Sequence, residues 1–146
     1  MRTHGVALNV DPTTLTRSQR AGITGRLALR FNDGHRDVFF PRADWSDFPV
    51  VLLSAWLPML RAVAERRSIG ADCHFMDGPF SFAVHATDDD FTLHVIDRQT
   101  SARADWTVPA AQFLLALREA GRVVLDACDA AGWDSGDIQA LRTELE

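Results

Sequence analysis

The stretch that decides the fold runs from Ala71 to Val108 and has the sequence ADCHFMDGPFSFAVHATDDDFTLHVIDRQTSARADWTV. Apolar and polar residues alternate along it, which is the pattern of β-strands with one buried face. The expected strands are 71–76, 80–86, 91–97 and 102–108. Turn sequences separate them at Asp77-Gly78, at 87–90 and at 98–101, so the stretch predicts an antiparallel meander.

The three turns agree on which side chains face the core. A two-residue loop at Asp77-Gly78 and another at Asp88-Asp89 fix the register of the first three strands. The cross-strand pairs that follow are Cys73–Phe82, Phe75–Phe80, Phe82–Val95, Val84–Leu93 and Leu93–Trp106. Because every pair is apolar, all four strands are expected to bury the same face.

The segments before the meander predict a hairpin and a helix. Residues 26–41 alternate around Asp33-Gly34, a two-residue turn that would place Leu29 opposite Val38, Leu27 opposite Phe40 and Arg30 opposite Asp37. Residues 47–67 show helical spacing, with Ser46 or Asp47 as the cap, and Pro58 predicts a kink or a break near Trp56-Leu57. Residues 6–10 alternate like a short strand, and residues 13–20 are expected to be a loop.

The segments after the meander predict two helices. Pro109 opens the first and Gly132 ends it, and Ser135 caps the second. The fold class is therefore α+β in a single domain, residues 1–146. We expect an antiparallel sheet, made of the N-terminal hairpin and the four-stranded meander, with the helices packed on one face and the other face open.

Composition excludes some function classes. The net charge is −5, which argues against nucleic acid as a partner because phosphate binding needs a basic stripe. No apolar run reaches the length of about 18 residues that a membrane helix needs, and Met1 to Gly5 lead into no secretory signal. Cys73 and Cys128 are expected to be buried free thiols, which fits a cytoplasmic location.

The register also predicts what the open face of the meander displays. His94 should lie directly across from Asp105, with Ser81 diagonal to it, an arrangement that raises the hypothesis of a hydrolase. His74, His85 and His94 share this face and raise the hypothesis of a metal site. No oxyanion hole, nucleophile elbow or metal-binding spacing accompanies them, so we expect no catalytic residue, no metal and no cofactor.

Aspartates dominate the charge of the meander. Asp88, Asp89 and Asp90 form the densest cluster in the chain, and the alternatives are a solvated turn or an acidic contact patch. We expect the partner-binding residues to be Asp72, His74, Asp77, His85, Asp88, Asp89, Asp90, His94, Asp97, Arg103 and Asp105. Reversing the charge of the cluster is expected to slow association with a basic partner, most at low salt.

The meander 71–108, the acidic corner 88–90 and the helical segment 113–133 resemble, in architecture and charge, the immunity proteins of bacterial contact-dependent inhibition and polymorphic toxin systems. The resemblance implies a small non-catalytic protein that occludes the active site of a cognate toxin domain, commonly a nuclease, whose basic surface meets its acidic residues. Two alternatives stay open: a homodimeric structural or regulatory domain, and a small hydrolase that uses His94 and Asp105.

Overall fold

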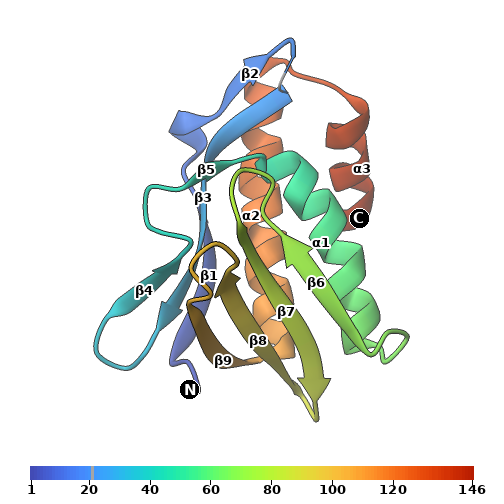
Figure 1. Cartoon of the computed structure of the whole chain (residues 1–146). Helices are drawn as coiled ribbons and strands as arrows, with labels where there is room; N and C mark the ends of the chain where they lie inside the picture. Colours follow the sequence, from blue (N-terminus) through green and yellow to red (C-terminus); the bar gives the residue numbers. More distant parts are fainter. Residues whose placement is uncertain (21) are drawn as a thin grey trace.

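The computed structural model describes residues 1–20 and 22–146 and shows an α+β fold (Figure 1). The strands are β1 (Gly5–Val10), β2 (Thr16–Ser18), β3 (Gly22–Asn32), β4 (Asp37–Phe40), β5 (Ser46–Asp47), β6 (Gly70–His74), β7 (Phe80–Thr87), β8 (Asp90–Asp97) and β9 (Arg103–Pro109). The helices are the short 3-10 helix η1 (Pro12–Thr14) and the α-helices α1 (Pro49–Ala64), α2 (Ala110–Ala131) and α3 (Gly136–Leu145). None of the helices in the described residues is long and apolar enough to cross a lipid bilayer.

The meander forms as predicted. Its strand order is β6-β7-β8-β9, and its turns and register are those expected from the sequence. The confirmed pairs are Cys73–Phe82, Phe82–Val95, Val84–Leu93 and Leu93–Trp106, and the amide of Phe75 donates to the carbonyl of Phe80 at 3.1 Å. Phe82 and Leu93 are completely buried, so the face of the meander that was predicted to face the core does so.

The N-terminal strands form a second sheet instead of joining the meander in a single one. The long strand β3 is its centre and pairs with β1, β2, β4 and β5. The two sheets meet where the rings of Phe31 (β3) and Trp106 (β9) stack at 4.7 Å, and where Arg2 and Thr107 form a parallel bridge. Alternation in the sequence shows which side chains are buried, but it does not show which distant strands share hydrogen bonds.

The predicted register of the N-terminal hairpin is wrong by two residues. Leu29 pairs with Phe40 and Phe31 pairs with Val38, because the loop contains four residues, Asp33 to Arg36. The carboxylate of Asp33 accepts the amides of His35 and Arg36 at 2.9 Å each, which holds this wider loop closed. A shift of two residues keeps every side chain on its face, so the core is unaffected.

Two local predictions are also corrected. Residues 16–18, expected in a loop, form β2 and pair with the start of β3. A kink or a break was expected near Pro58, and the helix α1 continues through this residue without a break. Trp56 and Leu57, just before the proline, are each only 2% exposed, and we attribute the unbroken helix to their packing in the core.

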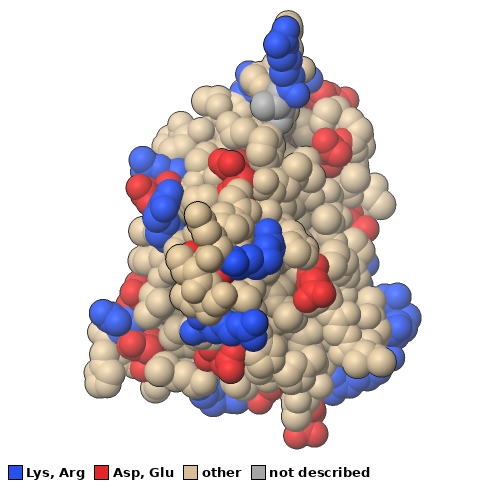
Figure 2. All heavy atoms as spheres, in the orientation of Figure 1, with Lys and Arg blue, Asp and Glu red and all other residues tan. Residues whose placement is uncertain are grey.

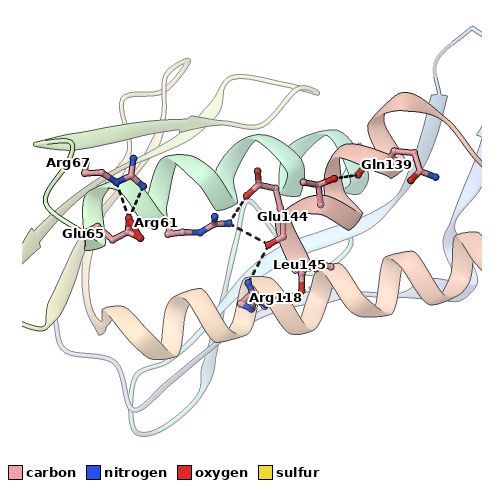
Figure 3. A network of polar contacts seen from close by, with 8 residues as sticks. Arg61, Glu65, Arg67, Arg118, Gln139, Glu144 and Leu145 are labelled. Atoms are coloured by element: carbon pink, nitrogen blue, oxygen red, sulfur yellow. Dashed lines mark hydrogen bonds and ion pairs between the residues drawn. The ribbon is translucent and has the colours of Figure 1, made fainter.

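The helices cover one side of the meander, with α1 packed on β6 and β7 and α2 packed on β8, β9 and β1 (Figure 1). Gly132 ends α2 in a left-handed conformation and Ser135 caps α3, both as predicted. Arg61 of α1 and Arg118 of α2 donate to the carbonyl oxygen of Glu144 at 3.4 and 3.3 Å (Figure 3). These cations meet the negative end of α3 and hold it across the other two helices.

Candidate functional site

The outer face of the meander is the surface that the helices leave uncovered (Figure 1). Strand alternation turns the apolar side chains toward α1 and α2, and polar side chains therefore point the other way. We call the outward set the meander face and define it as Asp72, His74, His85, His94, Arg103 and Asp105. Asp72, His74, His85, Arg103 and Asp105 are exposed and His94 is half-buried, so the predicted open face is confirmed.

His94 stands at the centre of the meander face. It lies directly opposite Asp105, and its Nδ1 is 2.6 Å from the Oδ1 of that residue. The ring of His85, on the neighbouring strand, stacks on the ring of His94 with 5.2 Å between centroids and 24° between planes. Side chains from β7, β8 and β9 are thus held against one another in the positions that the register predicts.

The same geometry bears on the hydrolase hypothesis. A serine nucleophile needs a hydrogen bond with its base and access to a substrate. Ser81 lies opposite Ile96, not opposite His94, and is only 7% exposed. Among the residues that the structure describes, the hydrogen-bond partner of His94 is Asp105. His94 therefore has a carboxylate that orients it, but Ser81 is not placed to serve as its nucleophile.

The three histidines of the meander face do not converge. The Nδ1 of His74 lies 2.7 Å from a guanidinium nitrogen of Arg98, while His85 and His94 stack on each other. Within residues 1–20 and 22–146, no three side chains of histidine, cysteine, aspartate or glutamate are grouped so that they could hold a metal ion. Arg98 was not a sequence candidate, because its place in a turn gave no sign that it reaches back to β6.

The acidic corner, Asp88 to Asp90, is partly engaged by arginines. Arg2 binds the carboxylate of Asp90 at 2.8 and 3.3 Å, and this hydrogen bond lowers the pKa of Asp90. Arg66 donates to the main-chain carbonyl of Asp88, whose φ of 54° is left-handed. The carboxylates of Asp88 and Asp89 stay exposed and are the two available to a partner.

Asp77 and Asp97 lie at the opposite end of the meander from the acidic corner. The strand β7 runs from one end to the other and has eight residues, so the two ends lie about 25 Å apart. Asp97 accepts the amides of Gln99 and Thr100 at 2.9 and 3.4 Å and so closes its own turn. The predicted partner-binding residues therefore occupy three places: the acidic corner, the meander face and the far turns.

Charges of both signs are mixed on this side of the molecule. Figure 2 shows acidic and basic side chains interspersed across the view, with no broad area of one sign. Arg103 belongs to the meander face itself, and Arg98 contacts this face through its hydrogen bond with His74. A partner of this face meets donors and acceptors together, and the purely acidic element is confined to Asp88 and Asp89.

Asp47 is a buried carboxylate whose role the sequence did not reveal. It is 1% exposed and accepts four N–H groups: the indole of Trp45 at 3.0 Å and the amides of Phe48, Met76 and Asp77 at 2.8, 3.2 and 3.1 Å. The sequence suggested only a helix cap. Asp47 in fact ties the start of α1 to the turn between β6 and β7, which supports one end of the meander face.

The two cysteines are buried free thiols, as predicted. Burial, with a smaller contribution from Asp72, raises the pKa of Cys73 to about 12. Burial also raises the pKa of Cys128. Since the thiolate is the reactive form, neither side chain is poised as a nucleophile.

A hollow of about 630 Å³ lies away from the meander face, next to Arg17, Val50 and Trp133, and no histidine lines it.

Comparison of the chain with protein families, with curated proteins and with solved structures finds no match.

Proposed function

We propose that the chain is a non-catalytic binding protein that neutralises a cognate bacterial toxin domain in the cytoplasm by covering its active site, as immunity proteins do. The observation that carries the proposal is the meander face: a sheet surface left uncovered by the helices, whose polar side chains are held in place by one another.

Rigidity suits this surface for binding. A side chain that is already fixed loses little conformational entropy when a partner docks, so more of the contact energy appears as affinity. His94, Asp105 and His85 hold each other across three strands, and His74 is held by Arg98. Together they present donors and acceptors at fixed spacings, which favours one complementary partner over others.

The acidic corner supports a basic partner such as a nuclease domain. Asp88 and Asp89 have exposed carboxylates at the edge of the meander. Charges at the rim of an interface act mainly on the association rate, because they steer the approach of an oppositely charged surface. The corner would attract the toxin and the meander face would hold it.

The experiment first asks whether a toxin-like effector domain is encoded next to this chain, and uses that domain as the partner. Co-expression should rescue growth of cells that produce the domain, and purified proteins should form a complex. Asp88→Lys with Asp89→Lys should slow association, more at low salt, whereas His94→Ala with Arg103→Ala should speed dissociation. Glu119→Lys with Asp126→Lys, two exposed acids of α2, is the matched charge control and should change neither rate.

Two results would overturn the proposal. One is growth that is not rescued although the chain is produced and folded. The other is a complex whose rates are unchanged by the corner and face variants, which would place the contact elsewhere on the molecule.

A further inference from the structure

One edge of the meander has free backbone groups. The strand β6 is the end strand of its sheet, and no other strand of the described residues pairs with its outer side. The Phe75 amide bonds to β7, so by alternation Asp72 and His74 direct their N–H and C=O groups outward. Two neighbouring groups are already bonded, since Ser68 donates to the Gly70 carbonyl and the Met76 amide donates to Asp47.

Exposed apolar side chains flank this edge. Ile69, just before β6, is 97% exposed, and Met76, just after it, is 55% exposed. Large apolar residues are scattered singly on most protein surfaces, but here two of them bracket the same short strand. An edge with open hydrogen-bonding groups and apolar ends is a template for another strand.

The helix beside the edge is mostly apolar, and its polar side chains are Ser54 and Arg61. Its core side carries Leu53, Trp56 and Leu60, and the opposite side carries a stripe of Val51, Ala55, Pro58, Met59 and Ala62. Ala55 is exposed and the rest of the stripe is half-buried. A helix with an apolar stripe opposite its core side is typical of one that is buried on both sides, and this stripe is only partly buried in the monomer.

We propose that β6 and the outer stripe of α1 form a dimer interface with a second copy of this chain. The two β6 strands pair antiparallel about a two-fold axis and extend the meander across both subunits. The register follows from charge: Asp72 lies opposite the partner's His74, and His74 opposite the partner's Asp72. The neighbouring register would set Asp72 against the partner's Asp72, and like charges directly opposite destabilise a sheet.

This register uses the outward backbone groups of Asp72 and His74 on both strands. Asp72 and His74 both face outward, so each of the two pairs exchanges two N–H···O bonds, as hydrogen-bonded pairs of antiparallel strands do. It also brings the end of β6 that carries Ile69 next to the end of the partner's strand that carries Met76.

The protonation of His74 fits the pairing. A guanidinium has donors only, so the Nδ1 of His74 accepts its hydrogen bond from Arg98. The proton of the neutral ring then lies on Nε2, which is free to donate to the carboxylate of the partner's Asp72. The dimer contact thus needs no change at Arg98.

The test is sedimentation equilibrium of the purified chain over a range of concentrations. The wild type should behave as a reversible dimer. Ala55→Arg adds a charge to an exposed helix position and should weaken dimerisation at least about tenfold, a change of roughly 1.4 kcal/mol. Ala130→Arg, at an exposed position of α2, is the matched control and should leave the dimer intact.

A second pair of variants tests the register. His74→Asp sets two carboxylates opposite each other twice and should weaken the dimer about tenfold, while Asp72→His combined with His74→Asp restores both pairs and should recover most of the affinity. A monomer at every concentration overturns the proposal. So does a wild-type dimer that Ala55→Arg and His74→Asp leave unchanged, because its interface lies elsewhere.

Discussion

Replacing Asp47 by asparagine exchanges one carboxylate oxygen for an NH₂ group. We expect this small change to destabilise the protein strongly. The carboxylate accepts four N–H groups at 2.8 to 3.2 Å and is 1% exposed. In asparagine one of the two oxygens becomes an NH₂ group, which cannot accept, so two of the four donors lose their partner in either orientation. Hydrogen bonds to a charged group contribute about 1.5 to 3 kcal/mol each, and we expect a loss of roughly 4 kcal/mol.

Urea unfolding followed by tryptophan fluorescence measures this loss, and Trp45 reports it directly because its indole donates to Asp47. The melting temperature should fall by about 8 to 16 °C. Asp44→Asn is the matched control: its carboxylate is 73% exposed beside Arg42, and its stability should stay within about 0.5 kcal/mol of the wild type. A loss below about 1 kcal/mol for Asp47→Asn would refute the reasoning, because it would mean that the four contacts do not depend on the carboxylate.

Three further outcomes are expected. Phe31→Ala removes the buried ring that stacks on Trp106 between the two sheets and should cost about 4 kcal/mol in urea unfolding, whereas Phe39→Ala, at a half-buried position, should cost less than half of that. The pKa of Asp90 is lowered in the folded protein, so this residue contributes stability that is present above pH 3.8 and is lost as the pH falls through the pKa of the folded state. Asp90→Asn should therefore make the free energy of unfolding fall less steeply with decreasing pH in the acid range. An unchanged acid dependence would count against the Arg2 contact. With the pKa of Cys73 raised to about 12 and both cysteines buried, Ellman's reagent at pH 8 should find no reactive thiol until urea unfolds the chain.

The meander was predictable because its information is local. Three short turns in succession must agree on one register, and an error of one residue at any of them would have turned Phe82 and Leu93 to solvent. The hairpin around Asp33 lacked this check. A shift of two residues leaves the same side chains buried, and the choice was made by two amides that bind the Asp33 carboxylate.

The site was predictable to the same extent. The contact between His94 and Asp105 follows from strand pairing alone, and so does the neighbourhood of His85. The contacts of Arg98 with His74 and of Arg2 with Asp90 do not, because each joins residues far apart in the sequence through a long side chain that could reach several positions. Asp47 was underestimated since its four donors come from segments up to 30 residues away and converge only in the folded chain.

The segment that precedes β1 has a consequence for assembly. Met1 to Thr3 run beside β9, where the Thr107 amide donates to the carbonyl of Met1 and the Thr3 amide donates to the carbonyl of Thr107. This strap closes the side of the meander opposite β6. Addition of another strand to the meander is therefore blocked at β9, and self-association through β6 would stop at a closed pair.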